Sequence, residues 1–342
     1  MKHLLQGFSV FREQLSPVRL VTLGYLAYAL VGWLLLCLPF SQAQPVSWLD
    51  NLFESVSALS TTGLGTVSTS GTYTGFGQGV LLLLIQLGGI GYMTFGSFVV
   101  LARKGILPEK RSDIARVVFS VPNNLSIDHL LRSVILFTVF IELGGAVALY
   151  FAFRHAGMDA PIWTSIFHSI SAFCTAGFSL YDNSLETYRS DFWINTVLGL
   201  LSYLGAIGFI VCLDVWRRVT GTSDHITLTS KIIVTSTFWL SALGGLLFFI
   251  CEPSIQNLRA DDRFLAALFQ VMAALTTVGF NSISISQLSQ ASLFLLILLM
   301  VVGASPSGTG GGLKTTTFSA LLGVMRSAMR ADFGVCPLFL LP

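Results

Sequence analysis

Long apolar runs alternate with shorter apolar segments along this chain, and the same order occurs three times. Each long run holds about 20 residues or more, the length that an α-helix needs to cross a bilayer. These runs cover residues 20–38, 76–102, 130–153, 192–215, 232–250 and 293–325. Segments of about 12 residues lie between them, too short to cross and typical of helices that enter a membrane and return. They cover residues 48–60, 163–174 and 264–276. The pattern predicts an all-α integral membrane protein, built from tandem span–pore-loop–span repeats around a pseudo-symmetric axis normal to the membrane and surrounded by lipid.

The repeats give the predicted organisation of the chain. Repeat one covers 1–104, with spans 20–38 and 76–102 and pore loop 48–66. Repeat two covers 105–218, with spans 130–153 and 192–215 and pore loop 161–180. Repeat three covers 219–330, with spans 232–250 and 293–325 and pore loop 262–282, and an atypical tail covers 331–342.

Each short segment ends in a Thr-x-Gly turn, and the three turns align on their glycines. In every copy a Thr stands two positions before the glycine, an Ala five before and a Phe ten before. Backbone that is not helical is tolerated at membrane depth only where it lines an aqueous or protein-walled cavity. Helix C-termini and carbonyl oxygens converging there would favour a cation and replace its hydration shell. We therefore predict an ion-binding selectivity filter, with three structural turns in another kind of transporter as the alternative. Its residues are Thr61, Thr62, Gly63, Thr175, Ala176, Gly177, Thr277, Val278 and Gly279.

A glycine-rich break over 303–312 interrupts the last apolar run. A Pro and five glycines in ten residues do not form a stable helix, and Leu313 before Lys314 does not match a nucleotide-binding loop. We interpret the break as a gate below the filter, with a passive packing kink as the alternative. Lys314 could act as an electrostatic barrier or pair with Glu142. The predicted gate residues are Gly303, Pro306, Gly308, Gly310, Gly311, Gly312 and Lys314.

Composition supports a membrane protein and excludes several classes. The chain of 342 residues is 53% hydrophobic and 11% charged, whereas soluble domains carry roughly 25% charged residues. A net charge of +2 does not give the basic footprint of a nucleic-acid-binding protein. The five histidines and five cysteines are scattered without metal-type spacing. We expect no enzyme activity, no catalytic residues, no cofactor in this chain and no metal beyond the transported alkali cation.

Basic residues predict the orientation. With the N-terminus inside, 14 Lys and Arg residues fall on the inner side and four on the outer side, as the positive-inside rule requires. The outer four are Arg154, Arg189, Arg259 and Arg263. The Thr-x-Gly turns would then open outward.

At these residues the chain resembles the Trk/Ktr/HKT superfamily of cation transporters, and most closely the membrane subunit of Ktr-type bacterial potassium uptake systems. The motifs are the three turns, the stretch 84–91 with Met93-Thr94-Phe95 after it, and the segment 303–318. The resemblance implies potassium uptake across the bacterial inner membrane, with sodium as a second candidate ion and coupling partner. It also implies a homodimer with cytosolic nucleotide-binding regulatory subunits that move the gating loop.

Two features of the chain bear on this resemblance. Family members with Ser at the first filter glycine tend toward sodium, so glycine at 63, 177 and 279 favours potassium, with a sodium-preferring member as the alternative. The family has four repeats, and three occur here, so a fourth is expected to be missing. The tail over 335–342 fits no family element. A truncated, non-conducting fragment is therefore the other alternative.

Overall fold

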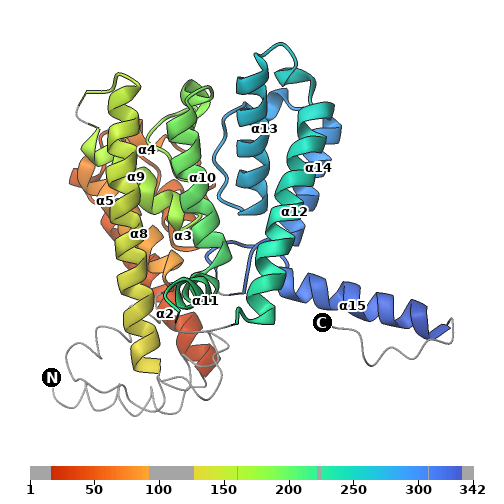
Figure 1. The fold of residues 1–342 in the computed structure, drawn as a ribbon. Coiled ribbons are helices and arrows are strands. Elements are labelled where there is room, and N and C mark those ends of the chain that lie inside the picture. Colours follow the sequence, from red (N-terminus) through yellow and green to blue (C-terminus); the bar gives the residue numbers. More distant parts are fainter. Residues whose placement is uncertain (1–16, 92–126, 160, 222–224, 307, 333–342) are drawn as a thin grey trace, which may run out of the picture. The chain divides into compact units, whose positions relative to one another are not determined.

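A computed structural model describes residues 17–91, 127–159, 161–221, 225–306 and 308–332 (Figure 1). Within these ranges the chain is helical, and its β structure is an isolated bridge between Gln42 and Tyr73. The chain divides into two compact units, residues 1–184 and 185–342, which are described separately below.

In the first unit, α2 (Pro17–Leu36), α3 (Trp48–Leu59) and α5 (Gly75–Gly89) pack together. Ser47 caps α3 by accepting the Asp50 N–H, and Thr74 caps α5 in the same way. Gly32 allows close packing, because a Cβ there would lie 2.6 Å from the Leu84 side chain. The short helices η1 (Pro39–Ser41) and α4 (Thr69–Thr72) connect these elements.

The second part of this unit is a long helix packed on a short one. They are α8 (Ile127–His155) and α9 (Ile162–Phe173). The Ser169 hydroxyl donates to the Glu142 carbonyl oxygen at 2.7 Å. Helix α9 also packs against α5, so the two short helices α3 and α9 share one supporting helix.

The second unit begins with η2 (Glu186–Tyr188), α10 (Phe192–Ile207) and α11 (Phe209–Val219). The sequence predicts a span over 192–215, and in the structure the helix is interrupted within this range. The helix breaks at Gly208, and α11 is bent by 100° from α10. Gly208 has a φ of 85°, which is incompatible with a continuing α-helix and is readily available to glycine.

Three helices form the core of the second unit, namely α12 (Leu228–Cys251), α13 (Ala260–Leu275) and α14 (Gln290–Val302), which lie side by side (Figure 1). Their buried contact includes Phe248, Val271 and Leu299. Gly244 lets the helices approach, because a Cβ there would lie 3.0 Å from Val271 and 3.1 Å from Leu299. The short helices η3 (Pro253–Ile255) and η4 (Ile285–Gln287) flank α13.

The last helix, α15 (Thr315–Asp332), is separate from α14. Residues 303–306 and 308–314 between them are not helical. In Figure 1, α15 runs crosswise from the lower end of α12, so the predicted last run 293–325 contains two helices with different directions.

Two described helices are long and apolar enough to cross a membrane, and they cover Arg132–His155 and Leu228–Cys251. The bent pair α10 and α11 would add a third. Shorter apolar helices cover Thr22–Leu36, Gly75–Gly89 and Gln290–Val302. The end of the predicted span 76–102, the motif at residues 93–95, residues 105–126 and residues 333–342 of the tail lie outside the described residues.

Candidate functional site

The first Thr-x-Gly turn follows directly from the way in which α3 ends. The Thr61 N–H donates to the Ala58 carbonyl at 3.2 Å, and the Thr62 N–H donates to the Ser57 carbonyl at 2.9 Å. These paired bonds form the Schellman motif, which closes a helix with one residue in the left-handed region. That residue is usually glycine, but here it is Thr61, with a φ of 49°.

The same backbone occurs in the other two turns. Thr175 has a φ of 50° and Thr277 one of 57°. The glycines two positions later, Gly63, Gly177 and Gly279, have φ values of 76°, 70° and 83°. A β-branched residue in the left-handed region is a conformational outlier. Its recurrence two residues before each glycine shows that the three turns share one backbone conformation.

The first two turns come together within the first unit. A Cβ built on Gly63 would lie 2.3 Å from the Ala176 carbonyl oxygen and 3.3 Å from the Gly177 Cα. The two predicted filter segments are therefore in backbone contact. The third turn lies in the second unit, where a Cβ on Gly279 would meet no atom of its own unit within 4 Å.

A buried polar side chain supports each turn, nine positions before the glycine. In the first turn the Glu54 carboxylate accepts the Thr66 N–H at 2.7 Å. In the third the Gln270 Oε1 accepts the Ser282 N–H at 3.2 Å. Each side chain fastens the segment that leaves the turn to the short helix that enters it.

His168 occupies this position in the second turn. Its Nδ1 lies 2.8 Å from the Thr164 carbonyl oxygen, so Nδ1 carries a proton and donates. Its Nε2 lies 3.0 Å from the Ser179 hydroxyl. From the sequence we would expect a polar packing residue here, but the role of this position is not predicted. The alignment on the glycines includes this position, but Glu, His and Gln differ in type there, so a search for identical residues does not find it.

In the first two turns a serine hydroxyl also binds the segment that follows the glycine. The Ser57 hydroxyl donates to the Leu64 carbonyl at 2.6 Å, and the Ser171 hydroxyl donates to the Phe178 carbonyl at 2.7 Å. Ala273 stands at this position in the third turn, which lacks the equivalent bond. The outgoing segment of the third turn is therefore less constrained.

A polar cluster lies behind the second turn. The Gln86 amide of α5 donates to both carboxylate oxygens of Glu142 of α8, at 3.0 and 2.9 Å. The Cys174 thiol, next to Thr175, lies 3.7 Å from the same carboxylate. Gly89 leaves room for this thiol, since a Cβ there would lie 2.4 Å from its sulfur. The cluster thus links α5 and α8 to the start of the second filter segment.

The glycine-rich segment folds back on itself between α14 and α15. The Ala304 N–H donates to the Gly311 carbonyl at 2.9 Å, and the Leu313 N–H donates to the Val301 carbonyl at 2.8 Å. Gly303 and Gly312 have φ values of 54° and 79°. The glycines therefore permit a compact loop.

This loop contacts the third turn. The Gly311 N–H donates to the Thr277 hydroxyl oxygen at 2.7 Å. A Cβ on Gly310 would lie 2.6 Å from the Thr276 carbonyl oxygen. The predicted gate and the third filter segment are thus joined by a direct hydrogen bond.

The loop also docks on the end of α10. The Ser305 N–H donates to the Ala206 carbonyl at 3.1 Å, and the Thr309 N–H donates to the Gly205 carbonyl at 3.0 Å. Gly308 fits closely, because a Cβ there would lie 1.9 Å from the Ala206 oxygen.

Two other predicted gate residues differ in their surroundings. The Lys314 ammonium donates to the Gly310 carbonyl at 2.6 Å and so closes the loop. Pro306 is exposed. The pairing of Lys314 with Glu142 stays a prediction, because these residues lie in different units.

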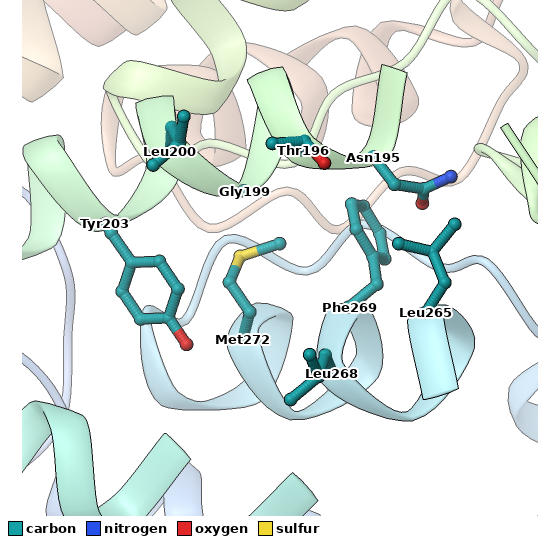
Figure 2. A pocket seen from close by; sticks show the side chains of 9 residues that line it. All are labelled: Asn195, Thr196, Gly199, Leu200, Tyr203, Leu265, Leu268, Phe269 and Met272. Carbon is teal, nitrogen blue, oxygen red and sulfur yellow. The ribbon is translucent and has the colours of Figure 1, made fainter. Parts of the chain in front are cut away.

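A cavity of about 220 Å³ lies between α10 and α13 (Figure 2). Most of its lining is apolar, and none of the lining residues is charged. They are Asn195, Thr196, Gly199, Leu200, Tyr203, Leu265, Leu268, Phe269 and Met272. This cavity is not suited to a bare cation. The described part of the chain also contains no group of three or more His, Cys, Asp or Glu residues that could hold a metal ion.

Comparison with known proteins identifies the family. The family model described as TrkH, cation transport protein, matches residues 30–337. The chain belongs to this family. It is 34% identical over 314 residues to the Ktr system potassium uptake protein B of Bacillus subtilis, covering 90% of this chain and 69% of that protein. It is 36% identical over 323 residues to the potassium/sodium uptake protein NtpJ of Enterococcus hirae, covering 91% and 70%.

A solved structure shows the same fold. The potassium transporter TrkH from Vibrio parahaemolyticus matches with a TM-score of 0.65 at 22% identity, over 96% of this chain and 66% of that one. The chain therefore spans about two thirds of the length of these TrkH-family proteins. The resemblance predicted from the turns is confirmed at the level of family and of an all-helical membrane fold.

Proposed function

We propose that this protein is the membrane subunit of a potassium uptake system. In this proposal a cation passes the Thr-x-Gly turns, and the loop over 303–312 gates its path. The three left-handed threonines at helix ends carry the proposal. They direct three short helices and the carbonyl-bearing segments after them into one repeated conformation.

Electrostatics favour a cation at such turns. Each short helix ends with roughly half a negative charge at its C-terminus. Carbonyl oxygens after the helix replace the water around an alkali ion. Glycine at 63, 177 and 279 supports potassium over sodium by the family resemblance, and the names of the Bacillus and Enterococcus relatives are consistent with potassium or with both ions.

The remaining parts of the proposal concern placement and assembly. We propose a bacterial inner-membrane protein with a cytoplasmic N-terminus, acting as a homodimer with a cytosolic nucleotide-binding subunit. The 14 inner basic residues against four outer ones support the orientation. The family resemblance supports the partners.

Isotope flux tests the conduction. Rubidium uptake would be measured in a bacterial host that lacks its own potassium uptake systems, with and without added sodium. We expect uptake that potassium inhibits competitively, and growth at limiting potassium. Faster uptake with sodium would support coupling. Rubidium uptake and growth no greater than in the host alone would contradict the proposal.

A glycine pair tests the gate in the same assay. Gly308→Ala would place a Cβ 1.9 Å from the Ala206 oxygen, so the loop would have to leave α10. Gly323→Ala in α15 meets no atom within 4 Å and is the control. We expect the Gly308 variant, but not the control, to change the uptake rate several-fold at equal expression. Equal rates in both variants would count against a gate at this loop.

A further inference from the structure

Helix α11 has one apolar side and one polar side. At 100° per residue, Cys212, Val215, Trp216 and Val219 lie on one side. Asp214, Arg217 and Arg218 lie on the other. A short helix with a large aromatic on its apolar side and basic residues on its polar side is typical of a membrane–water interface.

The apolar side of α11 is not covered by the second unit. Val215 is 41% exposed, Trp216 66% and Val219 77%. In α11 only Val211 is buried. Three adjacent exposed apolar side chains on one short helix need an apolar surrounding.

The direction of α11 indicates that the apolar surrounding of this side is the membrane surface. Because α11 is bent by 100° from α10, it lies close to the membrane plane when α10 crosses the membrane. Its 11 residues would extend about 16 Å along the surface. A helix in this position can place its apolar side among acyl chains and its polar side among headgroups.

Charge selects the kind of membrane surface. Arg217 and Arg218 stand in the last turn of α11 and are both exposed. The Asp214 carboxylate is bonded to the start of α12, where the Ser230 hydroxyl donates to it at 2.6 Å. The outward charge of this helix is therefore positive, and anionic headgroups attract it.

The bend connects this surface to the glycine-rich loop. Gly205 and Ala206, which accept the N–H groups of Thr309 and Ser305, lie in the last turn of α10. Gly208 follows two residues after Ala206. A shift of α11 at this bend therefore moves the carbonyls on which the loop is docked.

We propose that α11 docks on the anionic inner surface of the membrane, and that this docking holds the loop over 303–312 in place against α10. The ligand is a lipid surface that contains phosphatidylglycerol. The proposal rests on the placement of α10 across the membrane and on the cytoplasmic side of its C-terminal end. It does not depend on which cation is carried.

Amide hydrogen exchange on the full chain tests the docking without requiring transport. Exchange in α11 and in residues 303–312 would be followed in detergent, in phosphatidylcholine vesicles and in vesicles of phosphatidylcholine and phosphatidylglycerol in equal parts. We expect α11 to exchange about fivefold more slowly in the mixed vesicles than in phosphatidylcholine, which corresponds to one basic residue near an anionic surface.

Matched variants separate charge from folding. Replacing both arginines together, Arg217→Gln with Arg218→Gln, should lose the difference between the two vesicles, whereas Arg259→Gln, an exposed arginine of the outer set, should keep it. Trp216→Ala should speed exchange in α11 and in the loop, and Trp193→Ala, 57% exposed on α10, should leave both unchanged.

Three outcomes would overturn the proposal. One is exchange in α11 that is equal in detergent and in both vesicles. Another is a protein with both Arg217→Gln and Arg218→Gln that still distinguishes the two vesicles. The third is protection of α11 that arises only when a soluble cell extract is added, which would assign this face to a protein partner.

Discussion

Thr61, Thr175 and Thr277 adopt a backbone conformation that glycine usually supplies at a helix end. Placing a residue with a Cβ in the left-handed region costs roughly 1–2 kcal/mol. Each threonine follows a helix whose end is fixed by a bond to a carbonyl three residues earlier. Their hydroxyls are used locally, as in the Thr277 bond to the Thr276 carbonyl at 2.7 Å. Such strain persists where the surrounding structure determines it, and it is typical of functional segments.

The glycines of these turns differ in what surrounds them, which allows a paired prediction. Gly63→Ala adds left-handed strain and a clash with the Ala176 oxygen, whereas Gly279→Ala adds only the strain within its own unit. We expect Gly279→Ala to lower the free energy of unfolding by about 1–2 kcal/mol. Gly63→Ala should lower it by more. Thermal unfolding in detergent would measure both, and equal losses would contradict the contact between the first two turns.

At this scale the sequence predicts the position of the turns and misses their supports. Thr, Ala and Phe recur at fixed offsets because the same turn is built three times. Glu54, His168 and Gln270 share an offset and a task but not a residue type, so a search for identical residues passes over them. Ser57 and Ser171 are missed as well, because a single Ser in an apolar helix has no distinctive pattern.

At the scale of elements, one carboxylate joins the end of α12 to the start of α14. Glu252 follows α12 and is fully buried. It accepts the Ser254 N–H at 2.9 Å, the Ser289 N–H at 3.1 Å and the Ser289 hydroxyl at 3.0 Å. Burial acts to raise the pKa of this carboxyl, but these bonds and the Ser292 hydroxyl outweigh it and the pKa is lowered.

The lowered pKa predicts an acid-sensitive link. A carboxyl whose pKa is lower in the folded than in the unfolded state stabilises the protein above its unfolded pKa, about 4.3 for Glu. That contribution is lost as the pH falls through the folded pKa. Glu252→Gln should therefore lower the free energy of unfolding at neutral pH by about 1.5–3 kcal/mol, the worth of hydrogen bonds to a charged group.

Thermal unfolding between neutral and acidic pH checks this link. The difference between the Glu252→Gln protein and the unmodified one should shrink below about pH 4. Asp261→Asn is the control, because Asp261 is exposed and paired with Arg259 on the surface, where an ion pair contributes little. A difference that stays constant as the pH falls would contradict the role of the carboxylate.

The element boundaries were predictable where length and hydropathy decide them. Helices α3, α9 and α13 occupy the segments for which the sequence predicts short helices. The bend at Gly208 was not predicted, because one glycine within an apolar run gives no sign of its φ. The exposed apolar side of α11 continues the hydropathy of α10, so the run looks like a single span.

At the scale of the whole molecule, the distribution of basic residues determines the expected orientation. Helix α12 would then run from the inner side at Leu228 to the outer side at Cys251. Cys251 is exposed and would lie on the outer side. Arg218 of α11 is also exposed and would lie on the inner side. The three repeats and the expected absence of a fourth are defined from the sequence alone, and they stay a prediction.

Cysteine accessibility tests this orientation. One variant would keep Cys251 as the sole cysteine. Another would have all five cysteines replaced by serine and carry Arg218→Cys on the exposed polar side of α11. We expect a membrane-impermeant maleimide to label Cys251 in intact cells, and the Arg218→Cys protein only after the cells are permeabilised. The reverse pattern would place the N-terminus outside and would also remove the basis for an inner anionic surface at α11.

The contact between Gly63 and Ala176 has a consequence for biosynthesis. A membrane protein is made from its N-terminus, and α3 with the first turn leaves the ribosome well before α9 with the second turn. The backbone that Gly63 contacts is not synthesised until translation has passed Ala176. Until then the first turn is held only by its own bonds, such as those of Glu54 and Ser57. Its contact with the second turn forms only after the second turn has been inserted.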